Sequence, residues 1–376
     1  MKKALFTILA LFLLSSVFGK AQERTSIPAA DGRITYLGRV QKTDGAVKFD
    51  WAGVYARLRF QGSSLSVRVS DTKKNYYNVW LDRAMDAEPD KVIATRGSDT
   101  TLVLFSAEEI RARFGRKGSS AAHDVILQKR TEGEQGMTTL LSFCADGIFL
   151  QAEAPKERII EYVGDSYTCG YGSENSVRTD PFTPETENQN KTYASILARY
   201  FDADYFVVAH SGMGIARNYN DNQKGWYMPE RYLQTFDMDR ESRWDPAAGS
   251  SRPDITLVYL GTNDFSTARQ PSRQMFTENY RTLLRAIKAS YGDDYPILCI
   301  APKNDPGMYD YIRDAVASCG LKNVHVMALS SEVHDGDSDL GASWHPNYEG
   351  HKKKAYAILP YVATITGWAL SDRPLR

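Results

Sequence analysis

The chain has 376 residues, which is more than one ordinary domain needs and enough for two. Hydrophobic residues make up 42% and charged residues 24%, so the composition allows sizeable cores and argues against wholesale disorder. Lys plus Arg and Asp plus Glu each number 46, and this balance argues against a protein that binds nucleic acid phosphates or an anionic membrane surface.

The first segment has the pattern of a cleaved export signal. Met1–Lys3 is a basic head, Ala4–Phe18 is an apolar run, and Gly19-Lys20-Ala21 places small residues where a signal peptidase reads. The alternative is an uncleaved membrane anchor, but the run is short for a bilayer span, which needs about 20 residues. We therefore expect residues 1–21 to be a signal peptide on an exported protein, periplasmic or secreted, without stable membrane insertion.

Residues 22–152 have the alternation typical of short β-strands. Ala56–Phe60 and Leu65–Val69 alternate between apolar and polar residues, and Gln61–Ser64 between them predicts the turn of a β-hairpin. Further short segments with strand-like alternation are Tyr76–Leu81, Val92–Ala94, Thr101–Phe105, Asp124–Lys129 and Thr138–Phe143. Several short half-buried strands within about 120 residues predict a jelly-roll-like β-sandwich domain.

Residues 153–376 alternate between strands and helices instead. Short apolar or β-branched runs lie at Arg158–Val163, Tyr205–Ala209, Ile255–Leu260, Ile297–Ile300 and Val324–Met327. Helical patterns follow at Tyr193–Phe201, Gln274–Tyr291, Tyr309–Cys319 and Glu349–Ile358. Strand–helix–strand crossovers predict an α/β/α domain with a five-stranded parallel sheet. Functional residues of such sheets follow the carboxyl ends of the strands.

Two of these strand ends carry groups suited to nucleophilic catalysis. Ser166 closes Gly164-Asp165-Ser166, where the first strand turns into a helix and leaves the hydroxyl exposed. His345 stands in a loop pinned by Pro346 just before the last helix, and a neutral imidazole is the usual base for a serine hydroxyl. Taken singly, each has an ordinary explanation, namely turn chemistry for the serine and an exposed or structural histidine.

Two further strand ends carry candidate donors for a developing oxyanion. Gly212 lets the backbone approach a ligand with its N–H free, although a plain loop glycine explains it equally well. Asn263, in Gly261-Thr262-Asn263, offers a side-chain amide, and its alternative explanation is an Asx-type turn.

Taken together and in this order, the four blocks resemble the SGNH (GDSL-type) hydrolase superfamily over about residues 158–360. The resemblance implies that Ser166 is the nucleophile and that His345 takes its proton and later protonates the leaving alcohol. It implies an oxyanion hole formed by the backbone N–H groups of Ser166 and Gly212 and by the Asn263 amide. Neither a cofactor nor a metal ion is implied.

The sequence departs from this superfamily at one position. Most members have Asp three residues before the histidine, and here that residue is Ala342. Either a shifted acid orients the imidazole, for which Asp335, Asp337 and Asp339 are candidates, or His345 and Ser166 form a dyad. In a dyad, a backbone carbonyl or another group must accept the hydrogen of the far ring nitrogen. We favour the Ser166–His345 dyad, and the sequence does not identify the group that accepts the hydrogen of the far ring nitrogen.

The N-terminal domain narrows the resemblance to carbohydrate esterase family two. Local features that fit are Arg39, Phe49–Gly53, Tyr76–Asp82, Arg217-Asn218 and Ser343-Trp344. That family removes O-acetyl groups from plant-type polysaccharides such as xylan and mannan, including 6-O-acetyl hexoses. The resemblance thus implies a secreted carbohydrate acetyl esterase whose partner is an acetylated polysaccharide or oligosaccharide. Trp344 and Trp226 are candidate sugar contacts, because exposed indoles pack on the apolar faces of sugar rings.

Two alternatives and several questions stay open at this stage. The chain could act as a lipase or arylesterase on other acyl esters, or it could be a non-catalytic glycan-binding protein. The sequence decides neither the polysaccharide and hydroxyl position nor the oligomeric state. The pairing of the four cysteines is also open: Cys144, Cys169, Cys299 and Cys319.

Overall fold

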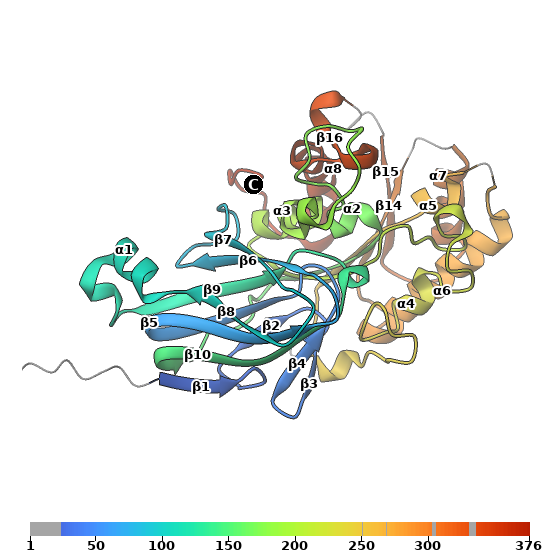
Figure 1. Cartoon of the computed structure of the whole chain (residues 1–376). Coiled ribbons are helices and arrows are strands. Elements are labelled where there is room, and N and C mark those ends of the chain that lie inside the picture. Colours follow the sequence, from blue (N-terminus) through green and yellow to red (C-terminus); the bar gives the residue numbers. More distant parts are fainter. Residues whose placement is uncertain (1–23, 250, 268, 303–305, 331–335) are drawn as a thin grey trace, which may run out of the picture.

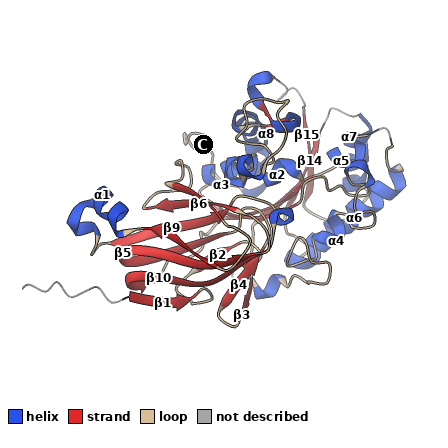
Figure 2. Cartoon of the chain, viewed as in Figure 1, coloured by secondary structure: helices blue, strands red, loops and turns tan. Residues whose placement is uncertain are grey.

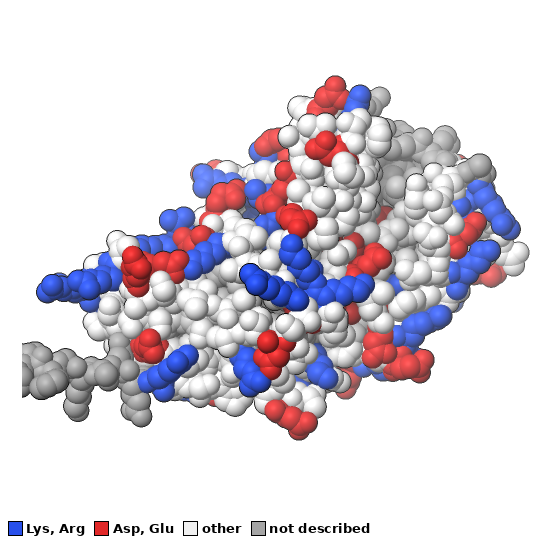
Figure 3. Space-filling view, viewed as in Figure 1, with Lys and Arg blue, Asp and Glu red and all other residues white. Residues whose placement is uncertain are grey.

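The computed structural model describes residues 24–249, 251–267, 269–302, 306–330 and 336–376. The expected signal peptide, residues 1–21, lies outside them. The chain forms an antiparallel β-domain followed by a domain in which helices flank a parallel sheet (Figures 1 and 2). Within the described residues, none of the helices has the length and apolar character that a membrane span requires. On the face drawn in Figure 3, positive and negative side chains are interspersed.

The N-terminal domain is one antiparallel sheet whose long strands change partners along their length. Its strands are β1 (Arg24–Pro28), β2 (Thr35–Leu37), β3 (Gln41–Thr43), β4 (Ala46–Phe49), β5 (Tyr55–Asp71), β6 (Tyr76–Leu81), β7 (Lys91–Ala94), β8 (Thr100–Phe105), β9 (Ala122–Lys129) and β10 (Thr138–Leu150). The main path runs β3-β4-β10-β5-β9-β6-β7, with β1 on β10 and both β2 and β8 on β5. Because β5 and β10 have different neighbours at their two ends, they carry the sheet around a common apolar core. The predicted two-domain architecture with an N-terminal β-domain is confirmed.

The predicted hairpin at Gln61–Ser64 is wrong. Strand β5 continues through these residues, and β10 runs beside it over nearly its whole length. Gly62 and Gly147 face each other next to a register shift, where the backbones come so close that a Cβ on Gly62 would lie 2.3 Å from the carbonyl oxygen of Asp146. The glycine therefore marks a bulged close approach of two strands, which local sequence does not distinguish from a turn.

Helix α1 (Ala107–Gly118) was not predicted within the β-domain. It begins at a capping box, in which Glu109 N–H donates to Ser106 Oγ (3.2 Å) and Ser106 N–H donates to Glu109 Oε2 (2.8 Å). That Ser-x-x-Glu pattern is readable in the sequence and would have found the helix start.

The C-terminal domain has the predicted five-stranded parallel sheet, in the order β12-β11-β13-β14-β15. The strands are β11 (Ile159–Gly164), β12 (Asp204–Ala209), β13 (Ile255–Tyr259), β14 (Ile297–Pro302) and β15 (Val324–Leu329). The helices are α2 (Ser166–Cys169), α3 (Tyr193–Tyr200), α4 (Met228–Arg231), α5 (Thr262–Phe265), α6 (Arg273–Tyr291), α7 (Pro306–Ala317) and α8 (Tyr348–Thr366). A short ribbon pairs β16 (Leu340–Gly341) with β17 (His345–Pro346).

Successive residues of the parallel strands enter two different cores. Tyr162 of β11 packs in the core under α3 and α8, whereas Val163 packs in the core under α6 and α7. The second core is continuous with that of the β-domain. Strands β11 to β14 are buried on both faces, which explains why their sequences are mostly apolar.

The two domains meet through buried charges rather than through a loose linker. Arg57 of β5 donates from Nη1 to Asp204 Oδ2 (3.0 Å), and the Tyr55 hydroxyl donates to Asp204 Oδ1 (2.7 Å). Farther along the interface, the Asp50 carboxylate accepts from the backbone N–H groups of Asp237 (2.8 Å) and Met238 (3.0 Å). All four cysteines are free thiols, so no disulfide joins the domains.

The Asp204 contact provides a stability test. We expect Asp204→Asn to lower the free energy of unfolding by about 3 kcal/mol, because it leaves the buried Arg57 guanidinium with only the exposed Glu153 carboxylate, 4.0 Å away, as a partner charge. Asp202→Asn is the matched control: Asp202 is exposed and pairs with Lys156 at the surface, so its loss costs less than about 1 kcal/mol. Urea denaturation of the three proteins measures both values, and equal losses would contradict the assignment.

Candidate active site

The four sequence blocks converge at the carboxyl edge of the parallel sheet. Ser166 follows β11, Gly212 follows β12 and Asn263 lies on α5 after β13, and these three strands are neighbours in the sheet. His345 reaches the same place from β17, ahead of α8. Thus residues almost 180 positions apart are brought into hydrogen-bond contact.

Ser166 and His345 are in the geometry of a nucleophile and its base. Ser166 Oγ lies 2.8 Å from His345 Nε2, and His345 Nδ1 lies 2.9 Å from the carbonyl oxygen of Ser343. Since a carbonyl only accepts, Nδ1 carries the proton of the neutral ring. Nε2 is therefore the acceptor for the Ser166 hydroxyl.

The described aspartates before His345 are engaged elsewhere. Asp337 pairs with Arg178 (2.7 Å), and Asp339 pairs with Lys353 (2.6 Å). Asp335 lies outside the described residues. The acceptor opposite His345 Nδ1 is thus a main-chain carbonyl two residues away, which was one of the alternatives left open by the sequence.

The Ser343 carbonyl belongs to a strained turn. Ser343 (φ 52°) and Trp344 (φ 59°) are consecutive non-glycine residues in the left-handed region, each at a cost of roughly 1–2 kcal/mol. Their N–H groups donate to the carbonyl oxygens of Asp180 and Arg178, both at 3.0 Å. These hydrogen bonds come from a different loop, so the aim of the Ser343 carbonyl depends on a distant segment.

The candidate oxyanion donors follow β12 and β13, the strands on either side of β11, which Ser166 follows. Gly212 has φ 78°, and its carbonyl accepts from Tyr219 N–H (2.8 Å). Asn263 Nδ2 donates to Met213 O (2.9 Å) and Asp165 Oδ2 (3.2 Å). Two acceptors fix the orientation of this amide, and a substrate oxyanion would have to share the hydrogen now directed at Asp165.

The loop that carries Gly212 is held from both domains. Asp264 accepts from the backbone N–H groups of Ile215 (2.9 Å), Ala216 (2.7 Å) and Arg217 (2.9 Å). On its other side, Glu132 of the N-terminal domain accepts from Ser211 N–H through Oε2 (2.7 Å). Sequence reasoning missed Glu132, because nothing in its neighbourhood signals a contact with a loop almost 80 residues later.

Burial shifts the pKa values of the ionisable groups around the dyad. Burial lowers the pKa of His345 to about 4, and the nearby Lys354 ammonium acts in the same direction. Burial likewise raises the pKa of Asp165 to about 7 and lowers that of Lys354 to about 7. Lys354 Nζ donates to the Tyr259 hydroxyl at 2.7 Å. At neutral pH the imidazole is therefore uncharged, as a general base must be.

Aromatic rings flank the base. The Tyr171 ring lies 4.3 Å from the His345 ring and stacks on Phe182 at 3.9 Å. Trp344, which precedes His345 in the chain, is 57% exposed, so its indole is accessible to a ligand. By contrast, the Trp226 ring is half-buried under the guanidinium of Arg231, 3.6 Å away, and its role in sugar binding stays a prediction.

A buried cluster behind the site has the donor atoms of a metal centre. Ligand atoms of Glu132, Cys169 and Glu187 lie within 4.8 Å of one another. Glu132 Oε2 already accepts from Ser211 N–H and from the Cys169 thiol (3.6 Å). Without a cation, burial raises the pKa of both Cys169 and Glu187, which favours their protonated forms.

Comparison with known proteins identifies relatives of both domains. Residues 162–353 match the GDSL-like lipase/acylhydrolase family, and residues 36–153 match the carbohydrate esterase 2 N-terminal family. The chain is 30% identical over 342 residues to the cellulase/esterase CelE of Acetivibrio thermocellus, covering 89% of the chain but only 40% of that longer protein. It is 27% identical over 380 residues to an acetylxylan esterase/glucomannan deacetylase of Cellvibrio japonicus, covering 97% and 98% of the two chains.

A solved structure is similar over the same length. A family two carbohydrate esterase from Clostridium thermocellum in complex with cellohexaose has 29% sequence identity and a TM-score of 0.78, over 89% of this chain and 100% of that one.

The low pKa of His345 predicts the pH dependence of the site. A base is active only when unprotonated, so a lowered pKa moves the acid limb of kcat/KM to lower pH. We expect hydrolysis of a soluble acetyl ester to keep its rate down to about pH 5. Lys354→Met removes a positive charge that disfavours the imidazolium, and should move the limb slightly upward. A wild-type acid limb at the ordinary histidine pKa or above would contradict this account.

Proposed function

Since the chain belongs to the GDSL-like lipase/acylhydrolase family and carries the N-terminal domain of carbohydrate esterase family two, we propose that it is an exported esterase that removes O-acetyl groups from plant-type polysaccharides. The substrates would be xylan and mannan or glucomannan, including 6-O-acetyl hexose units. The observation that carries the proposal is the hydrogen bond between Ser166 Oγ and His345 Nε2, with the opposite ring nitrogen held by the Ser343 carbonyl.

The chemistry follows from this geometry. His345 Nε2 takes the Ser166 proton as Oγ attacks the acetyl carbonyl, and the oxyanion is stabilised by the N–H groups of Ser166 and Gly212 and the Asn263 amide. The imidazolium then protonates the departing sugar oxygen, which leaves an acetyl group on Ser166. Water attacks this acyl-enzyme while His345 accepts its proton. The imidazolium then returns that proton to Ser166 Oγ as the Oγ–acyl bond breaks, which releases acetate and restores both the hydroxyl and the neutral imidazole.

A neutral partner for His345 suits the second half of the acylation. A buried imidazolium that meets backbone carbonyls and a nearby Lys354 ammonium, and no carboxylate, is a strong acid, as its lowered pKa indicates. The leaving group is a sugar alkoxide, which departs only when protonated. The neutral imidazole is therefore a weaker base toward Ser166, and the imidazolium is a correspondingly stronger acid toward the leaving sugar oxygen.

The surroundings of the site favour a sugar acetate over a long acyl chain. The exposed Trp344 indole and the partly exposed Phe182 ring, which stacks on Tyr171, are apolar surfaces on which a pyranose ring can pack. A cavity of about 760 Å³ does exist in the described part of the chain, but it lies between the domains, where Arg57, Asp204 and Arg373 line it. Its lining includes no residue of the four blocks, so it gives an acyl chain no path from Ser166.

Acetate release from acetylated xylan and glucomannan, wild type beside Ser166→Ala, tests the proposal. We expect release by the wild type from both glycans and a loss of roughly 10⁴-fold or more in the variant, since nucleophile and base act as a unit. Release of longer acyl groups but not acetate would favour the lipase alternative. Activity toward no ester, with glycan binding intact, would favour the binding-protein alternative.

Two further variants separate chemistry from substrate binding. Asn263→Ala should lower kcat about 10²- to 10³-fold on a small acetyl ester and on the polysaccharide alike, because its amide acts on the oxyanion. Trp344→Ala should raise KM for the polysaccharide and leave a small acetyl ester unaffected, since only the polymer reaches the indole. Steady-state kinetics on both substrates make the comparison, and a polymer-specific effect of Asn263→Ala would contradict its role.

A further inference from the structure

The carbonyl that orients His345 depends on a loop with little regular structure of its own. This segment, residues 173–188, is called the bracing loop here, and it runs between α2 and α3. Its Arg178 and Asp180 carbonyls accept the N–H groups of Trp344 and Ser343, and its Ser173 carbonyl accepts from Tyr348 N–H (3.1 Å) at the start of α8. The bracing loop therefore fixes the left-handed turn that aims the Ser343 carbonyl.

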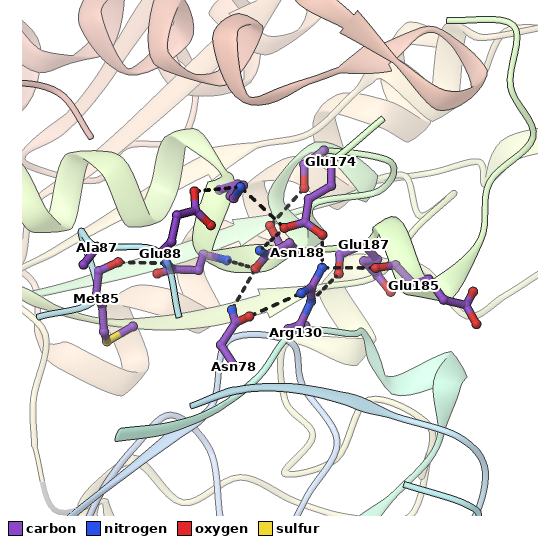
Figure 4. Close-up of polar contacts among 12 residues, drawn as sticks. Asn78, Met85, Ala87, Glu88, Arg130, Glu174, Glu185, Glu187 and Asn188 are labelled. Atoms are coloured by element: carbon purple, nitrogen blue, oxygen red, sulfur yellow. Dashed lines mark hydrogen bonds and ion pairs between the residues drawn. The ribbon is translucent and has the colours of Figure 1, made fainter. Parts of the chain in front are cut away.

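The two ends of the bracing loop are held together by one buried arginine of the other domain. Arg130 follows β9 and is 2% exposed (Figure 4). Its Nη2 donates both to the Glu174 carboxylate and to the Glu185 carbonyl (3.1 Å), and its Nε donates to the Glu187 carbonyl (3.2 Å). A planar guanidinium is suited to this, because its donors diverge at fixed angles toward several acceptors at once.

A second set of amide contacts closes the ring around Arg130. Arg130 Nη1 donates to Asn78 Oδ1 (3.3 Å), and Asn78 Nδ2 donates to Asn188 Oδ1 (3.0 Å). Asn188 Nδ2 in turn donates to Glu174 Oε1 (2.8 Å), as the dashed lines of Figure 4 show. The start and the end of the bracing loop are thus linked to each other and to β6 of the N-terminal domain.

We propose that Arg130 is a positioning residue for the general base: through the bracing loop it holds the Ser343 carbonyl where it keeps the His345 proton on Nδ1. The proposal rests on the Ser166–His345 chemistry proposed above. A carboxylate would attract the imidazole over a range of positions, whereas a neutral carbonyl orients it only when it is itself precisely placed. An active site built on a dyad therefore needs a rigid support, and this chain takes it from the N-terminal domain.

The kinetic test compares two buried arginines of the N-terminal domain. Arg130→Gln should lower kcat on a small acetyl ester roughly 10- to 100-fold, with KM within about threefold, because a misplaced base slows the chemistry and not the binding. Arg39→Gln is the matched control. Arg39 is equally buried at the domain interface, but its contacts go to the carbonyls of Tyr232 and Gln234 and to Glu161, none of which belongs to the bracing loop.

If Arg130→Gln does not fold, two milder variants test the same proposal. Arg130→Lys retains the charge opposite Glu174 but cannot donate to both loop carbonyls in the same geometry, and should fall between wild type and Arg130→Gln. Glu174→Gln changes a partly exposed member of the same contact and should lower kcat in the same direction by less.

Nitrogen NMR reads the tautomer directly. The chain has six histidines, so ¹⁵N-histidine labelling gives a small set of signals, and His345→Gln identifies those of His345. We expect wild type and Arg39→Gln to show His345 protonated at Nδ1 and unprotonated at Nε2. In Arg130→Gln, both nitrogens should move toward values averaged over the two tautomers.

Failure of the Arg130 proposal and failure of the proposed function give different results. A wild-type tautomer and a kcat within about twofold of wild type in Arg130→Gln would overturn the proposal, as would equal losses of kcat in Arg130→Gln and Arg39→Gln. If wild type hydrolyses no ester, the proposed function fails, and the NMR comparison still decides whether Arg130 positions the imidazole.

Discussion

The hydrogen bond from His345 Nδ1 to the Ser343 carbonyl is the constraint on which the rest of the site depends. It fixes the tautomer, and the tautomer decides that Nε2 accepts the proton of Ser166. Burial lowers the pKa of His345, and the neutral carbonyl opposes that shift less than a carboxylate would. Orientation has to come from the rigidity of the backbone at Ser343 and Trp344, both in a conformation that neither residue prefers.

That rigidity is supplied across the domain boundary. The β-domain contributes Arg130 to the bracing loop and Glu132 to the turn before Gly212, so a single segment after β9 contacts both loops that frame Ser166. Burying these charges is costly unless each is paired and hydrogen-bonded, and here each is held by several partners. The β-domain is thus structurally part of the candidate active site.

Prediction from the sequence was correct for most strands and failed where a residue's role depends on a distant contact. The five parallel strands were predicted because each is a short, mainly apolar run, and the bounds predicted for Tyr76–Leu81 are those of β6. The hairpin at Gln61–Ser64 failed because a glycine needed for the close approach to Gly147 has the same local signature as a turn. Tyr171 and Glu132 were missed because their importance lies in what they contact after folding.

The sequence by itself determined the order and identity of the chemical groups: a serine, a glycine, an asparagine and a histidine, each following a recognisable element. Such groups are readable because their side chains carry the chemistry and because parallel strands bring their carboxyl ends to one edge. Only the tertiary structure decided which group faces the far nitrogen of His345. Every residue has a carbonyl, so a carbonyl leaves no mark in the sequence, and its direction is set by contacts with Arg178 and Asp180, more than 160 residues earlier.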